Sequence, residues 1–525
     1  MMENKRKING KKCSKNIRKY CREYCEYTGI HGLRYFGEKR SMFEKICWFV
    51  VFVTSLMVCI AVIYKVYKKW QFAPIMVNFS SDEKDINEIP FPAVTICGEV
   101  RVSKEHFNYS HVLKNLVEKK ELKPTELKHL QYMSLLCAEN KIYCHEIPNV
   151  TTIDEEFYTF LAEGKTPFFD SCVWMGKDFD CNNIFRPIVT DEGLCYTFNM
   201  LEPKDIFNDI SFIPEFDHKP EYPTFSHQWS VDYGYAPDAG VDTYPRRALL
   251  AGSTNSLVVN MYINPNDIDY ACTSFQGFQI VLHQAVRYPL VQTHYFRVPM
   301  RKAIVVAITP VQMISSDDVK EYVPEKRECY MQGEKDLKFF SNYSQNNCQL
   351  ECISNYTKLR CGCVAFYMPR ETNTPICGNG NRNCMKQVRN SLDWRKLHLS
   401  ITSAGNNYNE CGCLPMCTML DYETEITEIE YDRFKEYEAV GISKNGSKQE
   451  YAWSQLVIYF KKVNFIPHVR SELYGHLDFL SNVGGLLGLF IGFSLLSLFE
   501  IIYFMTIRIF CNMKLFKHWS GDHIQ

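Results

Sequence analysis

The chain has 525 residues, in which 59 Lys or Arg are balanced by 60 Asp or Glu, for a formal net charge of −1 at pH 7. This net charge is itself uninformative because the composition is uneven along the chain, and no nucleic-acid partner is expected. The His-Glu-x-x-His, Walker-type glycine-loop and Gly-x-Ser-x-Gly patterns are missing, so the sequence indicates neither an enzyme of these classes nor a metal or other cofactor.

The N-terminal segment and the first apolar run predict a membrane span. Residues 1–45 carry thirteen Lys or Arg against five Glu, so this segment is predicted to be cytoplasmic. The run Ile46–Tyr64 has 19 residues without a charge, which would form a helix of roughly 28 Å, close to the hydrocarbon thickness of a bilayer. It begins too deep in the chain for a cleavable signal peptide. We therefore assign a span to residues 46–65; the alternative, a buried soluble helix, is rarely apolar for so long.

The orientation depends on residues 66–475, because Lys65, Lys68 and Lys69 also charge the other flank of the first span. Of 23 cysteines, 17 lie in residues 97–417, which is typical of an oxidising compartment. We therefore predict that residues 66–475 are extracellular and that both termini are cytoplasmic. The same region contains six N-glycosylation sequons, at Asn78, Asn108, Asn149, Asn342, Asn355 and Asn445.

This extracellular domain is predicted to combine strands and helices, and hence to be an α+β domain. A polar region, residues 104–163, has helical character. Residues 207–244 form a turn-rich insert with many aromatic side chains, which would serve as a sensing surface or as a subunit contact. Runs rich in β-branched and aromatic residues predict strands; they are residues 91–97, 257–263, 278–283 and 455–460.

Residues 329–417 hold ten cysteines, and their spacing predicts a disulfide ladder. Cys348 and Cys352 are four residues apart, which places them on one face of a helix, and Cys411 and Cys413 are two apart, which places them on one face of a strand. If these two elements are antiparallel, Cys348 meets Cys413 and Cys352 meets Cys411, and Cys329 and Cys417 close the outside of the ladder. The predicted bridges are Cys348–Cys413, Cys352–Cys411, Cys329–Cys417, Cys361–Cys384 and Cys363–Cys377.

Zinc binding is the alternative for this block, since Cys-Gly-Cys occurs twice. Extracellular thiols oxidise, however, and no His accompanies these pairs at ligand spacing, so bridges are expected. Outside the block, Cys172 and Cys181 are predicted to form a short local bridge. Three cysteines are then left, Cys137, Cys144 and Cys272, so one of them has no partner within the domain. We predict that Cys137 pairs with Cys144 and that Cys272 is free or forms an intermolecular bond.

The last apolar run, residues 479–507, has 29 residues and one charge, Glu500. It is longer than a straight span requires, so it must tilt, kink or break, and Gly492-Phe493-Ser494 is the expected place. Small residues and a carboxylate predict a helix that lines a water-filled path, because an intramembrane charge must face water or a partner. The alternative is close helix packing through Gly484, Gly488 and Gly492.

These runs divide the chain. The predicted segments are a cytoplasmic N-terminus (1–45), a first span (46–65), an extracellular domain (66–475), a second span (476–507) and a cytoplasmic tail (508–525).

With these motifs in this order, the chain resembles the degenerin/epithelial sodium channel superfamily, and most of all its insect pickpocket branch. The resemblance covers nearly the whole chain, and it includes His31-Gly32, residues 91–97, residues 193–199, the segment from Tyr343 to Cys352, and Gly492-Phe493-Ser494. It implies a trimeric, voltage-independent cation channel of the plasma membrane that favours Na⁺ and is usually blocked by amiloride. It also implies a hand-like extracellular domain with a β core, a helical finger and a cysteine-rich thumb (329–417), and a Cys97–Cys195 bridge.

The expected partners are lipid, permeant Na⁺ and related subunits. A trimer also has a physical argument, because two helices from one chain cannot enclose a water column. Whether the trimer is homomeric or heteromeric stays open.

The resemblance also implies residue roles. Gly492-Phe493-Ser494 matches a Gly-x-Ser selectivity filter, where an extended break turns backbone carbonyls toward the ion. Phe493 departs from the family, which usually has a small residue there, so either its ring points away from the pore or the ion preference differs. Gly488 matches the position of amiloride block, and Ser481 matches a position at which bulky side chains hold family channels open.

The remaining candidate residues lie at the two ends of the span and before the first span. Glu500 is expected to form an inner ring of charge; the alternative is a salt bridge to Arg508 or to a basic group near the first span. Asp478 and Asn482 are expected at the outer mouth, although Asp478 could be an ordinary solvated helix start. His31-Gly32 matches a cytoplasmic gating motif, in which Gly permits a sharp turn beneath the filter; the alternative is a surface turn.

Three other classes of protein compete with this interpretation. A two-span receptor or adhesion protein without a pore would share the topology, but would not need Gly-x-Ser and Glu500 in its second span. An ATP-gated trimeric channel has a different order of motifs. An ecto-enzyme would require catalytic patterns that the sequence lacks.

Overall fold

The computed structural model describes residues 16–72, 75–137, 146–166, 168–214, 216, 228–402, 411–441 and 451–516. It divides into two compact units. The smaller unit combines Met1–Met76 with Ser471–Gln525, and the larger unit is Val77–Arg470. The chain therefore leaves the smaller unit after the first apolar helix and returns to it for the second.

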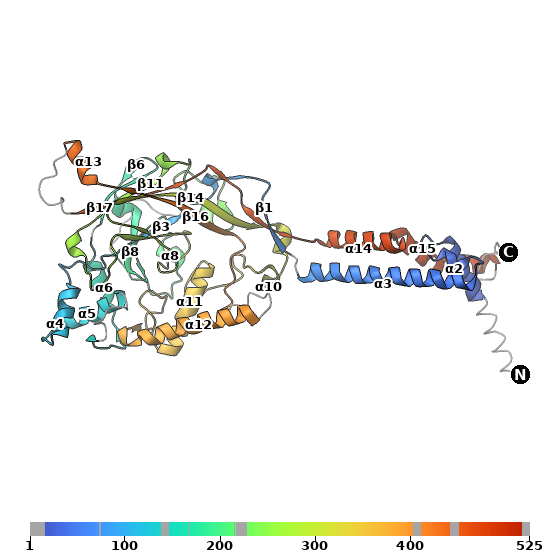
Figure 1. Ribbon diagram of the computed structural model, residues 1–525, viewed down its shortest axis with the longest axis horizontal. Helices are drawn as coiled ribbons and strands as arrows, with labels where there is room; N and C mark the ends of the chain where they lie inside the picture. Colours follow the sequence, from blue (N-terminus) through green and yellow to red (C-terminus); the bar gives the residue numbers. More distant parts are fainter. Residues whose placement is uncertain are drawn as a thin grey trace. The chain divides into compact units, whose positions relative to one another are not determined.

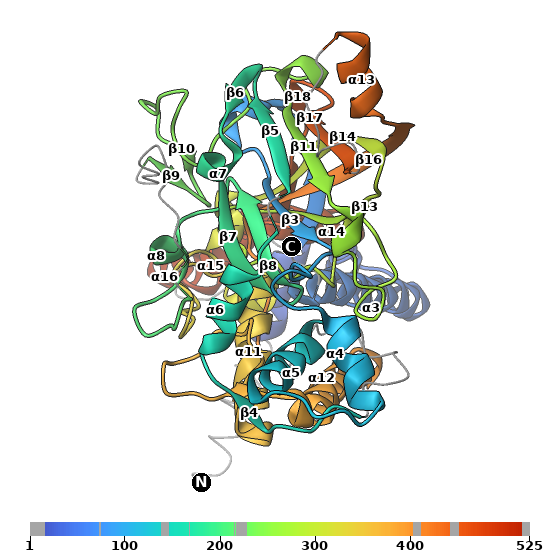
Figure 2. The same cartoon turned by 90° about the vertical axis from the view of Figure 1, so that its left-hand side faces the viewer.

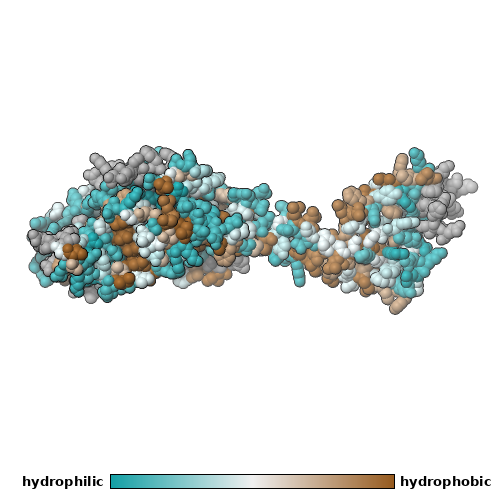
Figure 3. Space-filling view, turned by 90° about the horizontal axis from the view of Figure 1, so that it is seen from above, coloured by the Kyte–Doolittle hydropathy of each residue, from teal (hydrophilic) through white to brown (hydrophobic). Residues whose placement is uncertain are grey.

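The smaller unit is helical (Figure 1). Two stretches are long and apolar enough to cross a membrane, Met42–Gln71 and Leu495–Leu515, and His476–Ile491 is a shorter apolar helix. Only 6% of the window in the first stretch is buried, and Figure 3 shows apolar side chains over much of the visible surface of these helices. Its helices include α2 (Arg34–Gly37), α3 (Met42–Phe72), α14 (His476–Ile491), α15 (Leu495–Met505) and α16 (Ile507–Phe516), and residues 16–27 are helical as well.

Helix α3 contains the whole predicted first span and extends beyond both of its ends. The charge-free run ends at Tyr64, but the helix continues through Lys65, Lys68 and Lys69. Lysine is a good helix former, and its long side chain can bring the ammonium group to the membrane surface while the backbone stays helical. The absence of charged residues therefore predicts the apolar core of a span but not the two ends of its helix.

The larger unit contains two main sheets (Figure 2). The strand order of the larger sheet is β1-β19-β14-β17-β11-β5-β6, with β16 paired to β14; the other sheet has the order β13-β12-β3-β8-β7. The strands of the first are β1 (Ile75–Phe79), β19 (His468–Glu472), β14 (Lys302–Ser315), β17 (Ala452–Phe460), β11 (Leu257–Ile263), β5 (Phe169–Trp174), β6 (Lys177–Phe179) and β16 (Met419–Glu430). Those of the second are β13 (Phe296–Val298), β12 (Phe278–His283), β3 (Ala93–Gly98), β8 (Gly193–Phe198) and β7 (Phe185–Thr190).

The four predicted strands are confirmed as β3, β11, β12 and β17. They lie at the centre of the domain because most of their side chains are apolar, and the buried polar ones, such as Thr95 and His283, are hydrogen-bonded to each other. One apolar cluster contains side chains from both sheets. Phe91, which is fully buried, illustrates it: its ring lies 4.8 Å from that of Trp174, 5.5 Å from that of Phe460 and 6.3 Å from that of Phe198.

Helices surround this core. The region predicted to be helical, residues 104–163, contains α4 (Tyr109–Val117), α5 (Pro124–Leu136) and α6 (Glu156–Glu163) among its described residues. The cysteine-rich block contains α11 (Gln345–Cys361) and α12 (Arg382–Thr402). Shorter elements are β2 (Lys84–Asp85), β4 (Thr152–Ile153), α7 (Cys181–Ile184), α8 (Pro203–Ile206), β9 (Trp229–Ser230), β10 (Gly234–Tyr235), α9 (Asp317–Lys320), α10 (Pro324–Arg327), β15 (Ile376–Cys377), α13 (Arg433–Ala439) and β18 (Asn464–Phe465).

The cysteine ladder has the pairing that the spacing predicts. Cys348 and Cys352 lie one turn apart on α11 and are bonded to Cys413 and Cys411, respectively. Cys361, the last residue of α11, is joined to Cys384 near the start of α12. The structure also contains the bridges Cys329–Cys417, Cys363–Cys377 and Cys172–Cys181.

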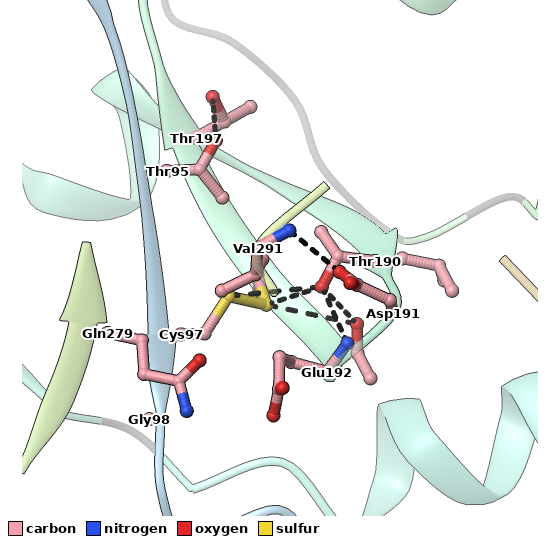
Figure 4. Close-up of a disulfide and its surroundings, with 12 residues drawn as sticks. Thr95, Cys97, Gly98, Thr190, Asp191, Glu192, Thr197, Gln279 and Val291 are labelled. Carbon is pink, nitrogen blue, oxygen red and sulfur yellow. Dashed lines mark hydrogen bonds between the residues drawn. A yellow bond between two sulfur atoms is a disulfide. The ribbon is translucent and has the colours of Figure 1, made fainter. Parts of the chain in front are cut away.

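The bridge implied by the resemblance, Cys97–Cys195, joins β3 to β8 in the second sheet (Figure 4). The close-up shows the bridge next to the turn between β7 and β8, where the Asp191 carboxylate accepts a hydrogen bond of 2.8 Å from the backbone N–H of Val291. Desolvation raises the pKa of Asp191, and the hydrogen bonds that its carboxylate accepts oppose this effect.

The prediction for Cys137 is wrong. Cys137 is bonded to Cys272, 135 residues away, and not to Cys144, which lies outside the described residues. Cys137 ends α5, and both cysteines belong to the same buried apolar cluster. The partner is therefore set by the tertiary packing of α5, which the proximity of Cys144 in sequence does not reveal.

The sequons differ in their surroundings. Asn78, Asn108, Asn149 and Asn355 are exposed. Asn342 is half-buried, and its amide nitrogen donates a hydrogen bond of 2.8 Å to the Asp205 carbonyl. Asn445 lies outside the described residues.

Candidate functional site

The second apolar run begins with a capped helix. Gly475 precedes α14, and its backbone N–H donates to the Asp478 carboxylate at 3.2 Å. A carboxylate in the first turn also interacts favourably with the positive end of the helix dipole. Asn482, one turn further, donates its side-chain amide to the Asp478 carbonyl at 2.9 Å. Asp478 thus has a capping role, and its side chain remains exposed in the single chain.

One face of α14 carries small and polar residues. With 3.6 residues per turn, positions 478, 481, 482, 485 and 488 point to one side of the helix, and Leu489 shares that side. All six are exposed in the single chain. A Cβ atom added at Gly485 would have no neighbour within 4 Å among the described residues. This face is therefore free to line a cavity or to meet another subunit.

The other side of α14 packs on α3 within the same unit. The Ser55 hydroxyl donates to the Phe490 carbonyl at 2.8 Å, and the rings of Trp70 and Phe479 stack at 4.7 Å. These contacts bind α14 to the first span near both ends of α14. They leave the small and polar face of α14 directed away from α3.

The span breaks where the sequence predicts. Helix α14 ends at Ile491, and Gly492 has φ 67° and ψ 23°, the left-handed conformation common at helix C-termini. The Gly492 N–H donates to the Gly488 carbonyl at 2.9 Å, and the Phe493 N–H donates to the Leu487 carbonyl at 3.2 Å. These bonds close the last turn and stop the helix.

The helix restarts at Leu495, after the three residues Gly492, Phe493 and Ser494. Ser494 is extended, with φ −120°, and its hydroxyl accepts a hydrogen bond of 3.2 Å from the Ser497 N–H, which caps α15. Within the described residues, the carbonyl groups of Gly492 and Phe493 accept no hydrogen bond. An unpaired carbonyl at this depth of an apolar segment is unfavourable unless water, an ion or a partner meets it.

The His31-Gly32 segment lies directly against this break. The His31 backbone N–H donates to the Ile491 carbonyl at 2.9 Å. A Cβ atom at Gly492 would lie 2.6 Å from His31 Nδ1, so the His31 ring fills the space that a side chain would need. Gly32, with φ +86°, makes the turn. The surface-turn alternative does not account for these contacts.

Glu500 does not pair with Arg508. Its carboxylate instead accepts a hydrogen bond of 3.2 Å from the backbone N–H of Gly29, two residues before His31. Arg508 pairs with Glu23 at 2.6 Å, and the Glu23 side chain is only 2% exposed. The same N-terminal segment therefore contacts the second span at the break, at Glu500 and at Arg508.

The sequence did not predict a role for Glu23 or Tyr20. The Tyr20 hydroxyl donates to the Phe504 carbonyl, and the Tyr24 and Phe504 rings meet edge to face at 5.2 Å. One signal was present: Glu23 is one of few acids in a basic segment, and Arg508 directly follows the apolar run. Neither residue identifies the other, because 485 positions separate them.

Two apolar spans, a large disulfide-bonded α+β domain between them and a second span interrupted at Gly492–Ser494 define a two-span membrane protein. A family model described as amiloride-sensitive sodium channel matches residues 24–504, so the chain belongs to the amiloride-sensitive sodium channel family. Members of this family form oligomeric channels.

Individual relatives agree with this assignment. The chain is 27% identical to pickpocket protein 28 of Drosophila melanogaster over 94% of this chain and 79% of that protein. It is 22% identical to the sodium channel protein Nach of Drosophila melanogaster over 95% of this chain and 89% of that protein. It is also 23% identical to acid-sensing ion channel 1 of Gallus gallus, over 92% of this chain and 82% of that protein. The match extends through both spans and the domain between them.

Proposed function

We propose that the chain is a pore-forming subunit of a voltage-independent, amiloride-sensitive cation channel that conducts Na⁺ across the plasma membrane. The chain's family supports the class, and the broken second span supports the place of conduction. The gate responds to an extracellular chemical, osmotic or mechanical stimulus. A receptor or adhesion protein without a pore is not favoured, because it would not require the break.

The observation that carries this proposal is the pair of unbonded carbonyls at Gly492 and Phe493. In a pore, these carbonyls would replace part of the hydration shell of an ion, as in other selectivity filters. Ser494 stays extended because its own side chain caps α15, so the break does not close into a continuous helix. Gly492–Phe493–Ser494 is therefore the proposed selectivity filter, and Phe493 is the residue expected to modify its preference among cations.

The free face of α14 supports an oligomer. Asp478, Ser481 and Asn482 are exposed on a helix that is otherwise apolar, and they would be costly in lipid. Around a threefold axis they would line the outer mouth. We propose a homo- or heterotrimer with related subunits, with amiloride-type block at Gly488 and a gate at Ser481.

Electrostatics support a path for cations through the rest of the span. Glu500 lies in the second half of the span, next to the N–H of Gly29, and carries no ion pair within the described residues. A ring of such carboxylates would attract cations to the inner end of the pore. The contact of His31 with the break then provides a route by which the N-terminal segment controls the filter.

The eight bridges support an oxidising, extracellular location for the larger unit, with both termini cytoplasmic. Exposed sequons at Asn78, Asn108, Asn149 and Asn355 are available for glycans there. Treating surface-labelled protein with an N-glycosidase should reduce its apparent mass. An unmodified protein that still reaches the surface would contradict this orientation.

The test of conduction is a voltage-clamp recording from oocytes that express the chain, alone and with related subunits, with surface biotinylation in parallel. We expect an amiloride-sensitive current that disappears when external Na⁺ is replaced by an impermeant cation. If the wild-type chain gives no current, the Ser481→Trp variant shows whether the channel is merely closed, because a bulky side chain at this position should hold the pore open. Surface-expressed S481W protein without current in every subunit combination would overturn the proposal.

A further inference from the structure

A cavity of about 340 Å³ lies in the larger unit beneath residues 229–235 of the aromatic insert. Its roof is the β9–β10 hairpin, in which Trp229 is paired with Tyr235 (Figure 2). Its floor is formed by the end of β14, with Gln312 and Ile314, and by the start of β16. This volume is within the range of small-molecule sites in proteins.

The hairpin is held in place from one side by Arg247. Its guanidinium lies over the Tyr235 ring, 4.5 Å from the centroid, and donates to the backbone carbonyls of Asn87, Ala239 and Gly240 at 3.1, 2.8 and 2.9 Å. All of these partners are neutral. Within the described residues no carboxylate pairs with Arg247, whose guanidinium is held there by carbonyl groups alone.

Three polar atoms on the residues that line this cavity are buried and have no hydrogen-bond partner among the described residues: Trp229 Nε1, Arg247 Nε and Gln312 Oε1. Buried polar atoms are nearly always paired, and an unpaired one costs free energy. Two of the three are donors and one is an acceptor. These atoms have almost no accessible surface as the side chains stand, so an occupant would reach them only after the side chains rotate toward the cavity. After such rotations, an occupant that presents an acceptor to the first two atoms and a donor to the third would satisfy them together.

The charges around the cavity select among such occupants. The ionisable residues that line it are Lys84, Glu88, Asp232 and Arg247, two of each sign. Asp232, like Arg247, forms no ion pair within the part of the chain that the structure describes. A free anion would meet the two carboxylates and a free cation would meet Lys84 and Arg247, whereas a zwitterion would match both signs.

The remaining wall combines apolar and aromatic side chains with the polar residues Ser230, Gln284 and Thr418. Val231, Ile314, Met419, Leu420 and Tyr422 line the cavity together with the two rings of the hairpin. Apolar walls with a few polar groups are typical of sites that orient a small ligand by its polar end and bury its side chain.

We propose that this cavity binds an apolar α-amino acid, with its carboxylate toward Arg247 Nε and Trp229 Nε1 and its ammonium toward Gln312 Oε1 and Asp232. Binding involves no covalent step. The regulatory part of the proposal rests on the proposed channel function; the binding part does not.

The floor of the cavity provides the route to the pore. Next to Gln312, residues Met313, Ile314 and Ser315 of β14 pair in parallel with His468, Val469 and Arg470 of β19. Strand β19 ends at Glu472, and α14 starts at His476. A ligand that favours one position of the end of β14 therefore also favours one position of β19, the strand that leads into α14. If this position differs between the open and closed channel, the ligand changes the fraction of open channels according to its difference in affinity for these two states.

The binding test uses the purified full-length chain in detergent and equilibrium dialysis with labelled L-leucine. Two matched probes compete: 4-methylpentanoate, which lacks the ammonium, and 3-methylbutylammonium, which lacks the carboxylate. We expect L-leucine to bind and each probe to compete at least tenfold more weakly. Saturable binding should weaken at least about tenfold in Arg247→Gln, because a charge-assisted hydrogen bond is lost.

The control variant is Arg246→Gln, whose guanidinium lies over the Phe179 ring at 5.3 Å and does not line the cavity. It should bind L-leucine as the wild type does. Gln312→Leu removes the acceptor but keeps the side-chain volume, and it should weaken L-leucine binding as Arg247→Gln does. Because Gln312 lies on β14 and does not hold the hairpin, this loss of binding would not be due to a displaced hairpin. No binding of L-leucine, or equal binding by Arg247→Gln and Arg246→Gln, would overturn the proposed site.

The regulatory test adds L-leucine to the external bath during recording. Current that changes in the wild type but not in Arg247→Gln supports the coupling. Binding without any effect on an established current overturns the regulatory part and leaves the site. Binding in a chain that never conducts would instead count against the proposed channel function.

Discussion

The ring of His31 occupies the space beside Gly492 in which a side chain would otherwise lie, and the backbone N–H of His31 bonds to the preceding residue, Ile491. His31 thus stabilises the end of α14 and leaves no room for a side chain at position 492, the first position of the proposed filter, so that glycine is required there. The break in the second span is therefore built from two distant parts of the chain.

Gly492→Ala should abolish or strongly reduce current at normal surface expression. The new Cβ would lie 2.6 Å from His31 Nδ1, and φ +67° costs an alanine about 1–2 kcal/mol. Gly484→Ala is the matched control, because its Cβ would meet nothing within 4 Å among the described residues and its φ is not positive. Equal, near-normal currents from the two variants would contradict the contact.

Ser481→Trp should give a constitutive current. Ser481 lies on the small and polar face of α14, where a large side chain would prevent closure of a narrow pore. The control is Leu480→Trp, since Leu480 is 67% exposed but points to the other side of the helix. Recording both variants before and after amiloride checks this expectation; a constitutive current in the L480W channel alone would reverse the assigned faces.

The Glu23–Arg508 pair should be required for surface expression or current. Glu23 is 2% exposed and Arg508 is 30% exposed, so an acid at position 508 would place a second negative charge beside a buried carboxylate. Arg508→Glu should therefore be defective, and the exchange Glu23→Arg with Arg508→Glu should restore part of the function. Arg34→Gln, which removes an exposed pair with Glu38, should change little. A defect in the double exchange as large as in the single variant would argue against direct pairing.

Peptide mapping without reduction should recover Cys137 linked to Cys272. Cys272→Ser should lower the free energy of unfolding by about 2–5 kcal/mol, whereas Cys144→Ser should leave the Cys137–Cys272 peptide intact. A recovered Cys137–Cys144 peptide from wild-type protein would contradict the packing of α5 that the structure describes.

His283 should make the larger unit less stable as the pH falls. Its burial lowers the pKa of the imidazole to about 4, and its ring nitrogens lie 2.8 Å from the Thr95 hydroxyl and 2.9 Å from the Gln284 carbonyl. Below the ordinary histidine pKa of about 6.5, the unfolded chain binds a proton that the folded chain does not, so stability falls between about pH 6.5 and 4. The loss is of the order of 1.4 kcal/mol per pH unit.

Melting temperatures of the purified chain and of His283→Gln, each measured at pH 7 and pH 5, test this expectation. Comparing the two proteins removes the contribution of the other titrating groups, among them Asp191, whose raised pKa acts in the opposite direction. The variant should lose less stability on acidification than the wild type. Parallel losses in both proteins would show that His283 titrates normally.

Local rules predicted much of this molecule. The β-branched and aromatic character of residues 257–263 and 278–283 identifies strands, and the spacing of the cysteines at 348, 352, 411 and 413 gives the ladder. Gly492-Phe493-Ser494 indicates the helix break because Gly accepts the left-handed conformation and Ser caps the next helix. Each of these features depends on residues that are close in sequence.

The features that the sequence did not predict depend on tertiary packing. Cys137 was assigned to its nearest neighbour because no local rule points to Cys272. Glu500 was expected to form an inner ring of charge, with a salt bridge to a basic side chain as the alternative; its contact with the backbone N–H of Gly29 is one that sequence patterns cannot rank. The cavity beneath Trp229 likewise arises only when the β9–β10 hairpin folds over β14.

The measurement that tests the central claim most directly is cysteine accessibility along α14 in a channel held open by Ser481→Trp. Asn482→Cys and Leu480→Cys lie at nearly the same depth, but only position 482 is on the small and polar face. A water-soluble, positively charged thiol reagent should block the Na⁺ current of the Asn482→Cys channel and leave that of Leu480→Cys unchanged. No block at position 482, or equal block at both, would contradict a hydrated path along this face.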